Sequence, residues 1–373
     1  PHVRKLVHHH RERQDQRKRK PVGERMEIKD EEGNIWITPS GIDKGTLTPA
    51  DIMKVTPSGD AIGCHTPSCE LPFHRAVYQC RPEARVVLHA HSPALVAFSL
   101  VGASPDAAWV PGAEKICGKI AFSRYDIPGS LSLGKIIAAE FAAGADCVMM
   151  ENHGAVVCGK TIAEAFTRFE TLDFLARIQI QASGLDNAPV LATPECCKCA
   201  RDWETFEAVY ASPDECALRD SIVRFAARLY RQRLVYTGAL TISTRIKGDD
   251  FLVTPRGIDP LAFASGDSVR IKEGKCESGK QPACITSLCR EIYRRFDWAN
   301  ALIFTKSPNM MAFGCTASTL DSRMIPESYI QLRDMPQIKF SDFAANPFAA
   351  VEKITPATPV VIVENLGVIA VGK

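Results

Sequence analysis

Residues 87–93 read Val-Leu-His-Ala-His-Ser-Pro, and 215 positions further on residues 302–308 read Leu-Ile-Phe-Thr-Lys-Ser-Pro. A short apolar run that stops at Ser-Pro predicts a buried strand leading into a helix. Side chains alternate across a strand, so His89 and His91 are expected on the same face. The second stretch keeps the apolar pattern and the Ser-Pro ending but has neither histidine.

Two further motifs repeat in the same order. Residues 37–43 return as residues 253–259, and Glu-Asn-His-Gly at 151–154 returns as Glu-Asn-Leu-Gly at 364–367. A period this long, at nearly constant spacing, indicates a duplicated domain and not a solenoid repeat. The 373-residue length also suits two domains, because single cores seldom grow beyond about 250–300 residues.

The chain between the two copies has the composition of a linker. It contains Gly184, Pro189, Pro194 and a run of cysteines, all of which are common in connecting segments. We therefore predict a first domain at 1–185 that contains all nine histidines, a linker at 186–214 and a second domain without histidines at 215–373.

Helices and strands are expected to alternate along the first copy. The patterns predict strands at 34–38, 86–91, 146–151 and 155–158, a helix start at 48–51, and helices at 70–79, 94–100, 132–142 and 162–183. Elements that alternate in this way pack as helices layered on a central sheet. The expected fold class is therefore α/β.

Composition excludes several classes of protein. The apolar fraction is 46% and the formal net charge is only +2, so we expect no general attraction to nucleic acid or to an anionic membrane. We find no run apolar and long enough to span a bilayer and no signal-peptide core. The opening tract at 4–20 is basic, yet it lacks the aromatic residues that stack on bases, which favours a solvated terminus over a nucleic-acid arm. His8, His9 and His10 in that tract are a weak metal signal.

The 14 cysteines do not form a disulfide pattern. Most stand singly in apolar segments, where free cysteine behaves as a small core residue, and this favours the reducing cytoplasm. Cys196, Cys197 and Cys199 are the exception. A zinc knuckle would need a second paired group, so reduced thiols in a linker are the favoured reading.

All nine histidines lie in the first 153 residues, and three of them have metal-ligand spacing. His89 and His91 can approach one ion together, and His153 at a turn between strands can supply a third nitrogen, which leaves a position open as in catalytic zinc sites. The spacing of His89 and His91 alone fits a metal site and a pair of hydrogen-bonded core histidines equally well. Glu70, near a helix start after Ser68, is placed to act as an acid or base.

The duplication favours the metal site. The four positions hold apolar residues or lysine in the second copy, while the surrounding apolar and turn residues persist. Loss of these polar residues together is expected if they act as one unit. The residues of the second copy are Ile285 for Glu70, Phe304 for His89, Lys306 for His91 and Leu366 for His153.

These motifs resemble the class II aldolase and adducin family. The resemblance rests on Thr-Pro-Ser-Gly at 38–41, Pro-Ser-Cys-Glu at 67–70, His-Ala-His at 89–91 and Asn-His-Gly at 152–154. It covers about 22–183 and, in degenerate form, 220–373. It implies a layered α/β/α domain with a central, mainly antiparallel sheet, present twice.

By that resemblance, the first copy is a zinc-dependent lyase of aldolase type, with another divalent metal as an alternative. His89, His91 and His153 would be the metal ligands, and Glu70 the catalytic acid or base. The substrate would be a small hydroxy-carbonyl compound or sugar phosphate, cleaved through a metal-stabilised enediolate. Ser40, Gly41 and Ser68 would bind substrate or phosphate.

The resemblance leaves alternatives open. An epimerase, dehydratase or decarboxylase would use similar chemistry, and an adducin-like binding protein would keep the fold without catalysis. Tyr125 is a candidate catalytic helper or a core or interface tyrosine. Lys306 either fills the vacated pocket or extends to solvent. Family sites lie between subunits, which implies a homo-oligomer with a small-molecule substrate.

The sequence also departs from the family. The phosphate loop Gly-Asn-x-Ser is replaced by Gly-Glu-Arg-Met-Glu at 23–27, and its carboxylates are expected to repel phosphate unless Arg25 offsets them. Cys69 stands where a second serine of the anion loop is usual. No tyrosine occurs near Trp109.

Overall fold

The computed structural model describes residues 25–185, 189–190, 203–209, 211–316 and 318–373. Two compact units are present. The first runs to Ala107 and resumes at Ala113–Arg177, and the second comprises Ala108–Gly112 and Ile178–Lys373. Each unit is built on one large sheet, so the α/β prediction is confirmed.

The sheet of the first unit has the strand order β4-β3-β2-β1-β5-β8-β7-β6. Every neighbouring pair is antiparallel except β6 with β7. The strands are β1 (Arg25–Lys29), β2 (Ile35–Ile37), β3 (Met53–Val55), β4 (Ala61–Ile62), β5 (Val86–Ala90), β6 (Ile120–Ser123), β7 (Cys147–Met150) and β8 (Gly154–Gly159).

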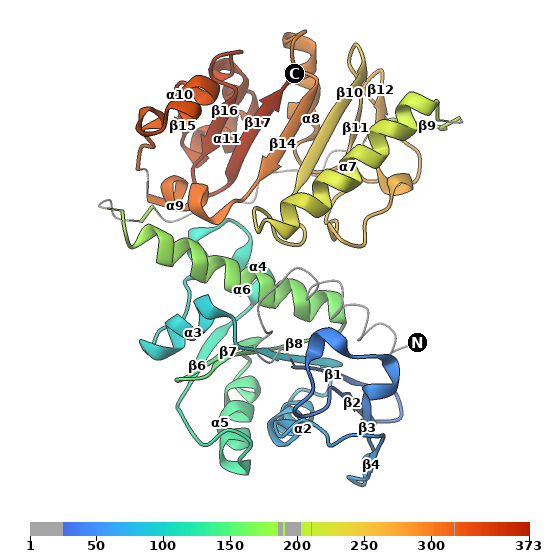
Figure 1. Ribbon diagram of the computed structural model, residues 1–373, viewed down its shortest axis with the longest axis vertical. Coiled ribbons are helices and arrows are strands. Elements are labelled where there is room, and N and C mark those ends of the chain that lie inside the picture. Colours follow the sequence, from blue (N-terminus) through green and yellow to red (C-terminus); the bar gives the residue numbers. More distant parts are fainter. Residues whose placement is uncertain (1–24, 186–188, 191–202, 210, 317) are drawn as a thin grey trace. The chain divides into compact units, whose positions relative to one another are not determined.

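Helices lie on both faces of this sheet, as Figure 1 shows for α2 and α5 on one side and α6 on the other. Phe73 and Val77 of α2 pack with Ile137 and Phe141 of α5 over the strands. The helices are α2 (Leu71–Cys80), α3 (Pro93–Leu100), α4 (Ala113–Cys117), α5 (Leu131–Ala142) and α6 (Ile162–Ala182), with short 3₁₀ turns η1 (Lys44–Thr46), η2 (Pro49–Asp51) and η3 (Ala107–Trp109).

The second unit repeats this plan. Its sheet order is β15-β16-β17-β14-β10-β11-β12-β13-β9. The strands are β9 (Thr205–Phe206), β10 (Thr241–Lys247), β11 (Asp250–Val253), β12 (Val269–Lys272), β13 (Lys275–Glu277), β14 (Ala301–Thr305), β15 (Gln337–Ile338), β16 (Val360–Val363) and β17 (Gly367–Gly372). The helices are α7 (Pro213–Arg231), α8 (Thr286–Arg295), α9 (Pro308–Thr316), α10 (Pro326–Leu332) and α11 (Phe340–Ala345), with 3₁₀ segments η4 (Ser265–Asp267), η5 (Ser322–Met324) and η6 (Pro347–Lys353).

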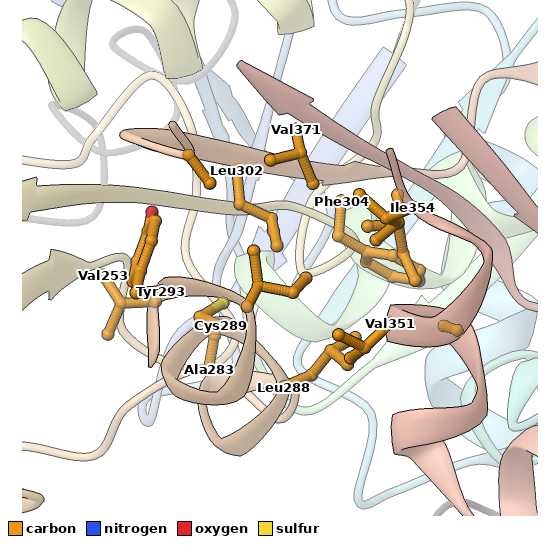
Figure 2. Close-up of a cluster of buried hydrophobic side chains, with 14 of the residues drawn as sticks. Val253, Ala283, Leu288, Cys289, Tyr293, Leu302, Phe304, Val351, Ile354 and Val371 are labelled. Atoms are coloured by element: carbon orange, nitrogen blue, oxygen red, sulfur yellow. The ribbon is translucent and has the colours of Figure 1, made fainter. Parts of the chain in front are cut away.

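Strand periodicity divides the second unit into two apolar layers. Phe251 and Val253 face the core under α8 and η6, whereas Leu252 between them faces the core under α7. Figure 2 shows the first of these cores, with Phe304, Leu302 and Val371 from the strands packed against Leu288 and Val351. The predicted layered fold with mainly antiparallel sheets, present twice, is confirmed.

Every element predicted for the first copy is present within a residue or two, with one exception, whereas β1, β3, β4, β6 and α4 were not predicted. The helix start expected at 48–51 is a single 3₁₀ turn, which Thr48 and Asp51 close with a capping box. No helix in the described part of the chain combines the length and the apolar composition needed to cross a membrane.

The proposed domain boundaries stay predictions. Within the expected linker, Thr205–Phe206 forms β9, which pairs in parallel with β13. The basic tract, the three histidines at 8–10 and the cysteines at 196–199 lie outside the described residues.

Candidate metal centre

The buried strand β5 places the first two histidines. His89 pairs with Val156 of β8 and is fully buried, and His91 follows directly after the strand ends. Nδ1 of His89 lies 2.9 Å from the carbonyl oxygen of Ala155. With the proton on Nδ1, this hydrogen bond leaves the Nε2 lone pair directed away from β8 and toward the other histidines.

The hairpin between β7 and β8 places the third histidine. Asn152 adopts a left-handed conformation with φ 54°, and the backbone N–H of His153 donates to Met150 at 3.1 Å. Gly154 follows, where a Cβ would lie 2.7 Å from the carbonyl oxygen of Ala90. Only glycine lets this turn approach β5 so closely, and the approach brings His153 to the end of that strand.

Glu70 reaches the same point from α2. It is the N-cap residue of that helix and is only 2% exposed. Its backbone N–H donates to Oγ of Ser68 at 3.3 Å. The carboxylate therefore lies at the start of a helix, where the macrodipole favours negative charge.

The four side chains converge. Ligand atoms of Glu70, His89, His91 and His153 all lie within 4.8 Å of one another. Nε2 of His89 is 3.2 Å from Nε2 of His91 and 3.2 Å from Oε2 of Glu70, and Nε2 of His153 is 3.5 Å from Oε1 of Glu70. A tetrahedral ion with bonds of about 2.0–2.1 Å would separate its donor atoms by about 3.3–3.4 Å. The spacing of these donors therefore fits a divalent cation.

Burial keeps the histidine at the centre of this group in its ligand form. Desolvation lowers the pKa of His89 well below its usual value; the nearby carboxylate of Glu70 opposes this shift, and His91 and His153 add to it. A neutral imidazole is the species that binds a metal, so the protein holds His89 ready for coordination at neutral pH.

A second buried pair lies beside this group and was not expected from the sequence. Nδ1 of His74 is 3.0 Å from Oε2 of Glu27, and both side chains are fully buried. His74 stacks on Phe73 with ring centroids 4.1 Å apart, and Phe73 meets the His89 ring edge-on at 5.6 Å. The carboxylate of Glu27 therefore lies buried against a histidine of α2.

The remaining candidate residues have different environments. Ser40 and Gly41 are exposed, and the backbone N–H of Ser40 donates to Thr66 at 2.9 Å. Ser68 is buried beside Glu70. The ring of Tyr125 is half exposed, on the loop after β6, and is not a member of the four-residue group.

The corresponding positions of the second copy belong to its apolar core. Phe304 is 8% exposed within the core that Figure 2 shows, and Ile285 and Leu366 pack against the same core. Lys306 is partly buried. The turn itself is kept, because Asn365 has φ 57° and a Cβ at Gly367 would lie 2.7 Å from the carbonyl oxygen of Thr305.

Comparisons of this chain with known proteins point to a single family. The sequence profile of the class II aldolase and adducin N-terminal domain matches residues 24–180 and 220–373. An L-fuculose phosphate aldolase of Methanococcus maripaludis is 34% identical over 158 residues, which are 42% of this chain and 85% of that protein. A 3-oxo-tetronate 4-phosphate decarboxylase of Escherichia coli is 32% identical over 151 residues, or 39% of this chain and 71% of that protein. A solved L-fuculose 1-phosphate aldolase superposes with a TM-score of 0.47 and 24% identity over 51% of this chain and 90% of its own.

Proposed function

Because the chain belongs to the class II aldolase and adducin family, we propose that its first domain is a zinc-dependent lyase of aldolase type. The observation that carries this proposal is the convergence of Glu70, His89, His91 and His153 within 4.8 Å. All four are replaced together in the second copy, whose sheet and turns persist. This pattern is expected when selection for a shared chemistry is relaxed in one copy, and it argues against a purely structural role in the first.

We assign the three imidazoles as ligands of the cation and Glu70 as the acid or base. A divalent cation bound here would supply a Lewis acid that stabilises negative charge on substrate oxygens. Glu70 lies within reach of the same point and has a carboxylate that can carry a proton. When the carbon–carbon bond breaks, the hydroxyl group of the departing fragment loses its proton and becomes a carbonyl, and the electron pair of the broken bond stays on the other, carbonyl-bearing fragment. Glu70 would accept and deliver protons in this step, so that the carbon of the second fragment gains the proton that the hydroxyl lost.

The proposed substrate is a small hydroxy-carbonyl compound that carries a phosphate. Both relatives described above have names that include a phosphorylated substrate. Ser40, Gly41 and Ser68 are the proposed phosphate contacts. The position of Glu27 is compatible with this choice, since its carboxylate is fully buried beside His74 and is not exposed where a phosphate would approach.

A decarboxylase or dehydratase is the second candidate, and it is favoured by a specific observation. The decarboxylase of E. coli and the aldolase of M. maripaludis have nearly the same identity to this chain, and a methylthioribulose-1-phosphate dehydratase of Methylococcus capsulatus is 30% identical over 166 residues. All three reactions require stabilisation of negative charge next to a carbonyl group. Glu70 and the three histidines fit each of them.

We propose that the second domain is a non-catalytic copy with an interface role and that the protein is a homo-oligomer. Phe304 and Leu366 are apolar, and the ammonium group of Lys306 carries a positive charge, so the three positions of the ligands offer no group that would hold a cation. Tyr125 is retained as a candidate helper because its exposed ring is available to substrate or to a neighbouring subunit.

The test is a substrate panel with metal-depleted and zinc-reconstituted protein. L-fuculose 1-phosphate, 3-oxo-tetronate 4-phosphate and methylthioribulose 1-phosphate would be assayed for aldehyde release, carbon dioxide release and loss of water. We expect turnover of at least one compound that disappears on chelation and returns with Zn²⁺. His153→Leu, which introduces the residue of the second copy, is the matched inactive control. Equal turnover in the chelated protein or in His153→Leu would contradict the proposal.

A further inference from the structure

A second group of metal-type side chains lies next to β4, an edge strand of the first sheet. Ligand atoms of Asp51, Cys64 and His65 all lie within 4.8 Å of one another. Nε2 of His65 is 2.8 Å from Oδ1 of Asp51, with both side chains about one quarter exposed, at 28% and 25%. Asp51 ends η2, and the other two residues follow the edge strand β4.

The local chain geometry fixes all three residues. Gly63 has φ 144°, and a Cβ there would lie 2.5 Å from Sδ of Met53, so only glycine allows the chain to cross over that methionine. The backbone N–H of His65 then donates to Met53 Sδ at 3.3 Å, and Sγ of Cys64 lies 3.4 Å from the carbonyl oxygen of Ala50. The loop thereby presents adjacent thiol and imidazole groups to η2.

Hydrogen bonds to Thr48 and the contact with His65 fix the carboxylate of this group. Oδ2 of Asp51 accepts from the backbone N–H of Thr48 at 2.7 Å and from its hydroxyl at 2.6 Å, while Oδ1 faces His65. One oxygen is thus held by the helix cap and the other is directed at the imidazole.

We propose that Asp51, Cys64 and His65 form a second divalent-cation site, selective for a thiophilic ion such as Zn²⁺. The donor set is one carboxylate oxygen, one imidazole nitrogen and one thiolate sulfur, which are the three ligand types of protein zinc sites. The exposure of Cys64 leaves room for water as a fourth ligand. Binding would release the thiol proton to solvent and convert the His65–Asp51 contact into shared coordination.

The second copy supports a cation at this place. The bridge between Pro39 and Pro67 corresponds to that between Pro255 and Pro282, so Lys280 stands where His65 stands. Its ammonium group donates to the carbonyl oxygens of Gly266 and Ser268 in the turn equivalent to η2 and pairs with Glu277 at 2.8 Å. A fixed positive charge therefore ties the same loop to the same turn in the second copy.

The site lies at the beginning of the segment that leads to Glu70. Directly after His65, the carbonyl oxygen of Thr66 accepts from Ser40 at 2.9 Å, and Pro67 bridges to Pro39. Ser68 and Glu70 follow. A cation bound at 51, 64 and 65 would hold the start of this segment and thereby restrict the chain that positions Glu70.

Cobalt binding separates this site from the three-histidine centre, because only a site with sulfur gives a thiolate-to-Co²⁺ charge-transfer band. The protein would carry Cys196→Ser, Cys197→Ser and Cys199→Ser to remove that cysteine cluster. We expect two equivalents of Co²⁺ and the band in this background. Adding His89→Ala and His91→Ala should remove one equivalent and leave the band.

The decisive variants are at the proposed ligands. Cys64→Ser should abolish the band and remove the other equivalent, and His65→Gln should weaken binding although glutamine can still donate to Asp51. Cys216→Ser, at an exposed cysteine of α7, is the matched control and should leave the band unchanged. A band that survives Cys64→Ser, or a background protein without the band, would overturn the proposal. Neither result depends on turnover, so failure here is distinct from failure of the proposed lyase.

A second measurement tests the effect on the loop. In the His89→Ala/His91→Ala protein, Zn²⁺ should slow amide hydrogen exchange at residues 63–66, and Cys64→Ser should remove this protection. Unchanged exchange in the metal-loaded protein would show that the site does not restrain the segment before Glu70.

Discussion

Replacing His89 by phenylalanine, the residue of the second copy, should abolish metal binding at the three-histidine centre and make the first unit more stable at acidic pH than the metal-free wild type. His89 is fully buried, and its pKa is well below the ordinary value of about 6.5 because of desolvation. The unfolded chain therefore binds a proton below pH 6.5 that the folded, metal-free protein does not bind. The free energy of unfolding of the metal-free protein therefore falls by about 1.4 kcal/mol for each pH unit below 6.5.

His89→Phe removes the part of the pH dependence of stability that comes from His89. At pH 7.5 the variant loses the hydrogen bond from Nδ1 to the carbonyl oxygen of Ala155, which lowers the free energy of unfolding by about 1 kcal/mol. Burial of the phenyl ring offsets part of this loss. At pH 5.5 the wild-type first unit should lose about 1.4 kcal/mol relative to the variant. Zn²⁺ at 100 times its dissociation constant should stabilise the wild type by about 2.7 kcal/mol and leave the variant unchanged.

Urea unfolding at the two pH values, with chelator and with Zn²⁺, measures both effects. The comparison is best made with Cys64→Ser in both proteins, so that the proposed second site adds nothing. The reasoning would be refuted if His89→Phe kept the pH dependence of the wild type or was still stabilised by Zn²⁺.

Three further changes test separate parts of the account. Glu70→Gln should keep the metal, measured by atomic absorption, while turnover falls by about 10²–10⁴, since the amide cannot carry a proton; unchanged turnover would make Glu70 structural. Gly154→Ala places a Cβ 2.7 Å from the carbonyl oxygen of Ala90, so thermal unfolding should occur earlier and zinc affinity should fall, and a variant with wild-type affinity would contradict the close-approach argument. Phe304→Ala should cost the second unit about 3–5 kcal/mol in urea unfolding and leave metal content unchanged, whereas a loss of metal would contradict a purely apolar role.

The sequence was sufficient to predict that the histidines converge. His89 and His91 follow from the period of a strand, and His153 follows from its place in a turn between two paired strands. The absence of all three from the second copy identified them as a group. Glu70 was a candidate acid or base because of its place near a helix start, and its replacement by Ile285 grouped it with the histidines. That its carboxylate reaches them depends on the packing of α2, which no local pattern predicts.

Contacts between distant segments were not predictable in this way. The pairing of Glu27 with His74 joins β1 to α2, and the contact of His65 with Asp51 joins a loop to a 3₁₀ turn. Neither pair has a regular spacing in the sequence. The turn at Pro49–Asp51 has the start signals of a helix, but the strand at Met53–Val55 follows at once and ends it.

Anomalous diffraction at the zinc absorption edge, from crystals of the zinc-loaded protein, tests the central claim most directly. We predict a peak bonded to His89, His91 and His153 at about 2.0–2.1 Å per nitrogen, and no peak beside Phe304 in the second domain. A second peak at Cys64 would belong to the other proposed site. Absence of zinc from the three histidines, with their side chains directed into separate cores, would contradict the account.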